Sequence, residues 1–120
     1  MFAVIYNAET RTVARDEITK PSLEYLQSIV DGLIEPIFTI DSPVAQGEIT
    51  GYVNEEGLLI PLPISGSIVF RGEYQPFAGN LIVVGLTRNG ESRGLTAEEA
   101  DKVTDAFDGT MLVVDDVTRS

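Results

Sequence analysis

The stretch Leu81-Ile82-Val83-Val84 constrains the fold most strongly, because it is the most hydrophobic uninterrupted run in the chain. Successive side chains of a β-strand point to opposite faces of the sheet. Four consecutive apolar residues in one strand therefore need cover on both faces. The run predicts a central strand of a sheet that is buried on both sides, and a chain of 120 residues is long enough to bury one such core.

Further segments rich in β-branched and aromatic residues predict the other strands. They comprise residues 2–6, 12–18, 33–40, 67–70 and 111–114. Pro36 interrupts the third of these, which favours an edge position or a bulge there. Polar residues, prolines and glycines predict a loop over Asp41–Gly51, an irregular link over Gly72–Gly79 and a loop over Thr87–Gly94.

Two short amphipathic helices are expected. Lys20-Pro21-Ser22 opens the first, which spans Pro21–Asp31 with Pro21 as its first residue and Gly32 as a left-handed C-cap. Thr96-Ala97-Glu98-Glu99 is a capping box that opens the second, and Gly109 is placed to cap its end. The buried stripe of this second helix comprises Ala100, Val103, Thr104 and Phe107.

The order of these elements predicts an α+β fold, because strands outnumber helices and do not alternate with them regularly. We expect one domain over residues 1–114, with a mostly antiparallel β-sheet and the two helices packed on it. Residues 115–120 are expected to form an acidic, frayed C-terminal tail. Within the domain, Asn54-Glu55-Glu56-Gly57 predicts the turn of a β-hairpin between Tyr52-Val53 and residues 58–60, with Gly57 at positive φ.

The chain has no histidine and no cysteine, which excludes the Ser-His-Asp triad, thiolate chemistry and the commonest metal ligands. We therefore expect a protein that is not an enzyme and that uses no cofactor and no metal. The alternative is a carboxylate-based hydrolase, because a pair of carboxylates can cleave glycosides. Its candidate residues are Glu35, Glu48, Glu55 and Glu56.

The formal net charge of −11 argues against direct binding to nucleic acid or to an anionic membrane, because phosphate groups would be repelled. No targeting segment and no stretch long and apolar enough to cross a bilayer is visible, so a cytoplasmic location is expected. The acids are unevenly spread, since residues 61–95 hold only two acids against three bases.

That less acidic middle region contains three arginines together with Tyr74 and Phe77, and proteins use arginine forks and an aromatic residue to hold a phosphate or a nucleobase. Arg71, Tyr74, Arg88 and Arg93 are the candidate residues for binding an anionic, nucleotide-like small molecule. The alternative is that the arginines simply balance nearby acids on the surface.

The second predicted helix offers a different surface. Its acids are three or four residues apart, so they line one face, and they comprise Glu98, Asp101, Asp105 and Asp108. Such a stripe could imitate a nucleic-acid backbone and occupy a basic site on a partner protein. The alternative is an ordinary solvent-exposed acidic face.

Several stretches, in order, resemble a family of uncharacterised proteins, the domain of unknown function 3846. They include residues 29–35, the hairpin motif at residues 52–59, Leu62-Pro63, residues 77–85 and residues 95–99. The Asn54–Gly57 turn and the Gly79-Asn80 strand opening are the most specific of them. The resemblance implies an accessory protein of phages, plasmids or bacterial mobile elements, and no activity is carried over with it.

Together these observations predict a small acidic binding protein, not an enzyme, that inhibits a host or defence component. It would act either through the acidic face, as a nucleic-acid mimic, or by sequestering an anionic nucleotide signal as an oligomer. The alternatives from other classes are the carboxylate-based hydrolase and a structural or assembly module. The latter would form a homo-oligomer through the apolar stretch Gly57–Phe70.

Overall fold

A computed structural model of the chain, which describes residues 1–57 and 64–119, places the most hydrophobic run at the centre of a sheet. This strand is β7 (Leu81–Leu86), and it pairs antiparallel with β1 (Phe2–Asn7) and with β4 (Glu48–Asn54). Residues 81–84 are fully buried and alternate between two separate core clusters. The prediction of a central strand covered on both faces is confirmed.

The strands form two sheets. The larger has the order β2-β1-β7-β4-β3, with β2 at Thr12–Glu17, β3 at Ile34–Asp41, and the short β8 (Ser92–Arg93) also paired with β7. The smaller has the order β6-β5-β10-β9, with β5 at Ile64–Phe70, β6 at Glu73–Ala78, β9 at Phe107–Asp108 and β10 at Met111–Val113. In the described part of the chain, the β5–β10 pair is parallel and the other pairs are antiparallel.

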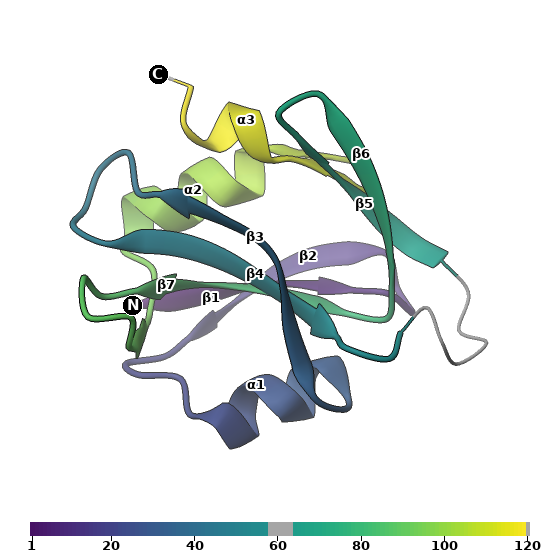
Figure 1. Cartoon of the computed structure of the whole chain (residues 1–120), viewed down its shortest axis with the longest axis horizontal. Helices are drawn as coiled ribbons and strands as arrows, with labels where there is room; N and C mark the ends of the chain where they lie inside the picture. Colours follow the sequence, from purple (N-terminus) through teal and green to yellow (C-terminus); the bar gives the residue numbers. More distant parts are fainter. Residues whose placement is uncertain (58–63, 120) are drawn as a thin grey trace.

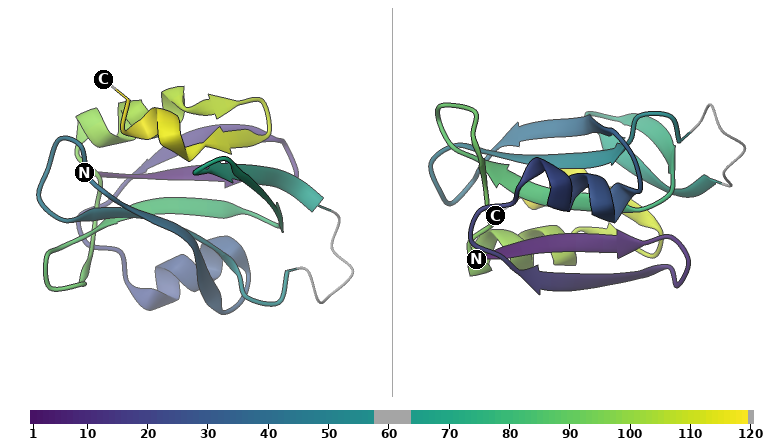
Figure 2. Two further views of the ribbon diagram at one scale, coloured as in Figure 1. Left: turned by 45° about the horizontal axis from the view of Figure 1, so that its top comes forward. Right: turned by 90° about the horizontal axis from the view of Figure 1, so that it is seen from below.

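The helices and the smaller sheet cover the two faces of the larger sheet (Figures 1 and 2). One face carries α1 (Leu23–Val30), whose Leu26 and Val30 pack on Ile82 and Val84. The smaller sheet, α2 (Ala97–Asp105) and α3 (Val114–Val117) cover the other face. The radius of gyration is 13.0 Å, close to the roughly 13.6 Å typical of one compact domain of this length. The chain is a single α+β domain with a mostly antiparallel strand arrangement, as predicted.

The helix boundaries differ in detail from the predicted ones. In α1, Ser22 is the N-cap and accepts from the Tyr25 N–H, so Pro21 precedes the cap instead of opening the helix. The left-handed residue at its C-terminal end is Asp31, with φ 61°, and not Gly32. The capping box of α2 is confirmed, but this helix ends at Asp105 and Gly109 lies in the turn between β9 and β10.

Three segments predicted as loops contain strands. Residues 48–51 belong to β4, most of Gly72–Gly79 forms β6, and β8 lies within Thr87–Gly94. Propensity underestimates these strands because tertiary pairing with β3, β5 and β7 supplies their hydrogen bonds. The second arm of the predicted hairpin, residues 58–60, lies outside the described residues. Gly57 does not have positive φ, so that part of the hairpin prediction is wrong.

The C-terminal segment is not a frayed tail over its whole length. Residues 114–117 form α3, and the side chains of Val114 and Val117 are fully buried against the core. The prediction of a tail from residue 115 is therefore wrong, because the two valines shield the same core cluster as α2. Thr118 and Arg119 are exposed.

Candidate functional site

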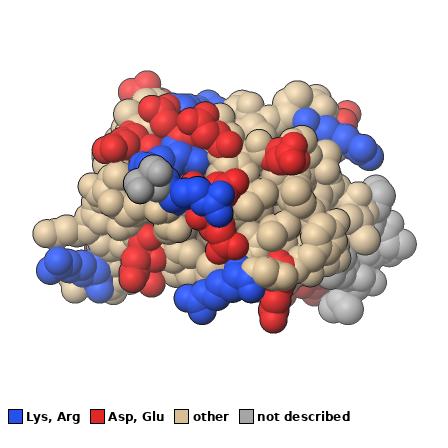
Figure 3. Space-filling model, turned by 90° about the horizontal axis from the view of Figure 1, so that it is seen from above, with Lys and Arg blue, Asp and Glu red and all other residues tan. Residues whose placement is uncertain are grey.

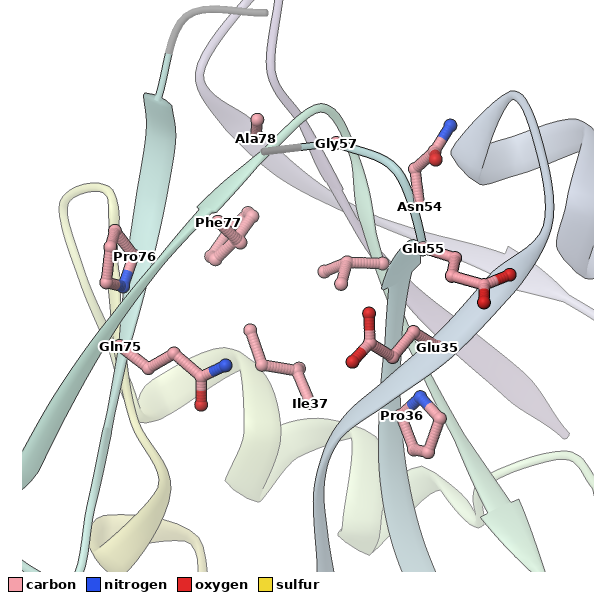
Figure 4. Close-up of a pocket in the computed structure, with 11 residues that line it drawn as sticks. Glu35, Pro36, Ile37, Asn54, Glu55, Gly57, Gln75, Pro76, Phe77 and Ala78 are labelled. Atoms are coloured by element: carbon pink, nitrogen blue, oxygen red, sulfur yellow. The ribbon is translucent and has the colours of Figure 1, made fainter. Parts of the chain in front are cut away.

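A pocket of about 120 Å³ lies where the two sheets meet, between β3 and β4 of the larger sheet and β6 of the smaller one (Figure 4). Both β3 and β6 are the outermost strands of their sheets. A second pocket, of about 280 Å³, adjoins the first and shares Ile37 and Gln75 with it. We call the two pockets together the groove.

A bulge in β3 shapes one wall of the groove. The register with β4 shifts between Pro36 and Phe38, which confirms the irregularity predicted at this proline. The extra residue lets Ile37 and Phe38 both pack against the core cluster that faces the smaller sheet. Glu35 is opposite Val53 in the ladder, so its side chain lies on the same face as Val53.

A tight turn positions the opposite wall. Arg71 and Gly72 both have positive φ, 53° and 78°, which defines the two-residue type I′ turn that joins β5 to β6. Because side chains alternate along β6, Gln75 and Phe77 share one face. Phe77 lies so close to Gly66 of β5 that a Cβ there would be 2.8 Å from its ring.

Two polar side chains point into the first pocket from opposite walls. Figure 4 shows the Glu35 carboxylate and the Gln75 amide turned toward the hollow, whereas Glu55 turns away from it. Val53 and Phe77 are buried at 7% and 2% exposure and form an apolar floor. The pocket thus combines one carboxylate, one amide and apolar walls.

Neither pocket alone reaches the volume usual for a drug-sized ligand or cofactor. Such pockets usually span about 300–1,000 Å³, against about 120 and 280 Å³ for the two pockets of the groove. An apolar cavity of roughly 150 Å³ accepts a benzene ring, so the first pocket matches a single side chain of another molecule.

Both free edges beside the groove carry a proline. Pro36 is in β3 and Pro76 is in β6. Proline has no N–H to offer a further strand, which blunts an edge against strand addition. The groove is therefore bordered by edges that favour side-chain contacts over backbone pairing.

Arg93, a predicted ligand-binding residue, is held inside the molecule. Its guanidinium makes two hydrogen bonds to the Glu99 carboxylate, Nη1 to Oε1 at 2.7 Å and Nη2 to Oε2 at 2.9 Å. It also donates to the backbone carbonyls of Leu86 and Gly94. Gly85 makes room for it, because a Cβ there would be 2.5 Å from Nη1. This arginine joins β8, α2 and the β3–β4 loop.

The Glu99 side chain is fully buried, and four hydrogen bonds satisfy it. Besides Arg93, Ser42 Oγ donates at 2.6 Å and the Thr96 N–H donates at 2.9 Å. Burial raises the pKa of this carboxyl, but the hydrogen bonds from Arg93, Ser42 and Thr96 outweigh that effect and hold the pKa below its ordinary value.

The structure does not bring the other predicted ligand residues together with Arg93. Arg71 is in the β5–β6 turn, where its guanidinium stacks 4.9 Å from the Phe70 ring centre and its N–H donates to Asp115. Tyr74 is an exposed residue of β6 that lines the second pocket. Arg88 is exposed in the loop after β7, at the left of Figure 1, whereas the β5–β6 turn with Arg71 is at the top.

The acidic residues of the second helix are exposed as expected. Glu98, Asp101 and Asp105 are on α2, whereas Asp108 follows in β9. Arg15 of β2 forms an ion pair with Asp101, so one member of the stripe is already paired. On the face seen from above, acidic side chains gather with lysine and arginine side chains among them (Figure 3).

The family-motif turn Asn54–Gly57 has a folding role. Asn54 Nδ2 donates to the carbonyls of Val30 and Asp31, and its Oδ1 accepts from the Glu56 N–H. Asn80, in the other specific segment, donates to the carbonyl of Ile29. Both asparagines thus satisfy carbonyls at the C-terminal end of α1, where a helix leaves them without partners.

The candidate carboxylates of a hydrolase do not converge on one cleft. Glu35 and Glu55 line the first pocket, but only Glu35 points into it (Figure 4). Glu48 is at the other end of β4, opposite Asp41 and Leu86, and Glu56 is exposed beside the turn. Within residues 1–57 and 64–119, no group of three or more acids is arranged to hold a metal ion.

Sequence patterns singled out Glu35, Glu55 and Tyr74, which line the groove, but did not place them in one site. Ile37 and Gln75 carry no motif, and Phe77 only begins the family-like stretch at residues 77–85. Gln75 and Phe77 also fall in a segment predicted to be irregular. The available signal was Pro36, which interrupts an otherwise strand-like segment, because such a proline marks a sheet edge. In the described part of the chain, no helix has the length and apolar character needed to span a membrane.

The fold and the groove define a small α+β domain with two packed sheets and a side-chain-sized cleft between their edges. The family model described as domain of unknown function (DUF3846) matches residues 1–108, and the chain belongs to this family. Neither the curated proteins nor the solved structures contain a match to it.

Proposed function

We propose that this chain is a small binding protein, not an enzyme, whose groove receives a segment of a partner protein. The observation that carries the proposal is the groove itself, in which a carboxylate and an amide face each other above an apolar floor. Protein-binding clefts combine such apolar pockets with a few oriented polar groups. The resemblance to a family expected in phages and mobile elements supports the proposal that the partner is a host or defence protein, inhibited in the cytoplasm.

Charge supports a basic partner. The net charge is −11, and three of the acids lie around the apolar surface of the groove: Glu35 of β3, Glu55 after β4 and Glu73 of β6. A basic segment would be attracted over a distance and would find acceptors where it docks.

Sequestration of a nucleotide has less support than protein binding. Arg93 is engaged by Glu99, and Arg71 and Arg88 are on separate turns. Neither of the two pockets that form the groove is lined by any of these arginines. The acidic face of α2 is a second candidate surface, because Glu98 and Asp105 are exposed there.

Two matched charge changes separate the groove from the acidic face. The full chain, Glu35→Arg and Glu98→Arg are each immobilised and exposed to bacterial lysate, and retained proteins are identified by mass spectrometry. We expect a partner that is retained by the full chain and by Glu98→Arg but lost with Glu35→Arg. Retention by Glu35→Arg together with loss in Glu98→Arg would favour the acidic face. A complete absence of retained partners would count against both surfaces.

A further inference from the structure

We propose that the groove recognises an arginine side chain of the partner, with an apolar side chain two residues away in the adjoining pocket. The guanidinium would lie between the Glu35 carboxylate and the Gln75 amide. This inference rests on the proposed function, because it assumes that the groove receives a protein segment. The inference adds which side chains of the partner segment the groove binds.

The first argument is charge complementarity. The Glu35 carboxylate points into the pocket, and the ion pairs of the described residues use other acids. Glu35 is exposed, and a carboxylate makes stronger hydrogen bonds to a cationic donor than to a neutral one. Within this acidic protein, the groove lacks a basic residue among those that line it.

The second argument is shape. The pocket of about 120 Å³ accepts one side chain, and its floor is formed by Ile37, Val53 and Phe77. An arginine buries its aliphatic stem against apolar surface while its planar guanidinium stacks on aromatic rings and donates in several directions. Two acceptors suit the guanidinium donors. The Glu35 carboxylate lies on one wall, and the Gln75 amide on the other wall would accept once its oxygen is turned inward.

The protein itself shows how it holds a guanidinium. Arg93 is bound by a two-fold contact to Glu99 and by further carbonyl oxygens. The groove offers a carboxylate of the same kind, Glu35, together with the Gln75 amide, in a place that a partner can reach.

The third argument is spacing along β6. The first pocket is lined by Gln75 to Ala78 and the second by Glu73 to Gln75, so the two are offset by about two residues, roughly 7 Å. An extended ligand presents side chains i and i+2 on one face at the same spacing. Ile68 and Phe70 give the second pocket its apolar surface. Pro36 and Pro76 keep the ligand from adding as a strand, so side chains carry the recognition.

A peptide titration tests this inference on the full chain. The probe is acetyl-Leu-Ala-Arg-Ala-Leu-amide, which places leucine two residues from arginine in either chain direction. The comparison peptide has citrulline, a neutral analogue, in place of arginine. Binding is followed by amide chemical shifts in ¹⁵N NMR spectra, which also report whether each variant is folded. We expect saturable shifts in β3, the end of β4 and β6, and affinity about tenfold or more lower for the citrulline peptide.

The variant Glu35→Gln removes the charge while keeping the shape. We expect it to bind the arginine peptide about tenfold more weakly and the citrulline peptide with unchanged affinity. The control Glu98→Gln removes a charge of the same kind from α2 and should bind both peptides as the parent chain does. Replacement of both leucines of the probe by alanine should weaken binding severalfold.

Equal affinity for the arginine and citrulline peptides, or shifts confined to α2, would overturn the inference. So would an unchanged arginine preference in Glu35→Gln. These failures differ from a failure of the proposed function. Suppose that Glu35→Arg loses the lysate partner, but the parent chain binds the arginine and citrulline peptides equally. The groove would then remain the proposed binding site, and only arginine would be rejected as its ligand.

Discussion

Glu99 and Glu35 are two carboxylates of this chain in opposite situations. Glu99 is fully buried and is met by the chain's own Arg93, by Ser42 and by a backbone N–H. Glu35 is exposed at the rim of the first pocket and points into it, and none of the described residues that line this pocket is an arginine. The first arrangement is complete within the fold.

The difference separates folding from binding. Removing one partner of a buried ion pair leaves an uncompensated charge in the core, so evolution can change Glu99 or Arg93 only at a large cost in stability. A rim carboxylate such as Glu35 contributes little to folding, because water solvates it in the unbound protein. The arginine that sequence reasoning assigned to a ligand therefore belongs to the fold, whereas the groove remains open to a ligand.

The largest expected effect is on the buried pair. Arg93→Ala should lower the free energy of unfolding by about 3–5 kcal/mol, because Glu99 would stay buried without its cation. Urea unfolding followed by circular dichroism measures this change. Arg88→Ala, at an exposed loop position, should stay within about 0.5 kcal/mol of the parent chain. Similar losses in both variants would break the distinction between a structural and a surface arginine.

A smaller loss is expected when one hydrogen bond to Glu99 is removed. Ser42→Ala deletes the hydroxyl that donates to Oε2 at 2.6 Å and should cost about 1.5–3 kcal/mol of unfolding free energy. Ser42→Thr keeps a hydroxyl and serves as the control, with most of that stability retained. An unchanged stability in Ser42→Ala would mean that water replaces the hydroxyl and that the Glu99 site is less closed than its burial indicates.

The fold was predictable where a sequence pattern is compatible with only one local structure. The run Leu81–Val84 had to be covered on both faces, and the Thr96–Glu99 capping box had to open a helix. Pro36 indicated an irregular edge for the same reason, because its missing N–H is incompatible with a regular central strand. These features are local or depend on burial alone.

The rest depends on contacts that are distant in sequence. β6 reads as irregular because Glu73, Gln75 and Pro76 are poor strand residues, and pairing with β5 overrides that preference. The sequence shows that Arg93 and Glu99 are six residues apart, but only the fold shows that they meet in the core. The groove needs β3 and β6 from two different sheets, so no single segment could reveal it.

The pH dependence of stability provides a further comparison. The pKa of Glu99 is lowered in the folded state, against about 4.3 for an unfolded glutamate. Its stabilising contribution is therefore complete above that value and is lost as the pH falls through the folded pKa. Urea unfolding between pH 3 and 5 should show a steeper fall for the parent chain than for the neutral double variant Arg93→Gln/Glu99→Gln. The difference in slope is at most about 1.4 kcal/mol per pH unit, since one proton is involved. Equal slopes would contradict the lowered pKa.

The smallest expected effect is the change in unfolding free energy when Glu35 is replaced. This change tests whether Glu35 and Glu99 differ in their contribution to folding. Glu35→Gln should leave the free energy of unfolding within about 0.5 kcal/mol of the parent chain, because the side chain is exposed and its charge is solvated. The same urea titration measures it beside Glu99→Gln, which should lose several times more because Arg93 would stay unpaired in the core. If Glu35→Gln were instead clearly destabilising, the Glu35 carboxylate would stabilise the fold. It would then no longer support the proposal that the groove is a binding site.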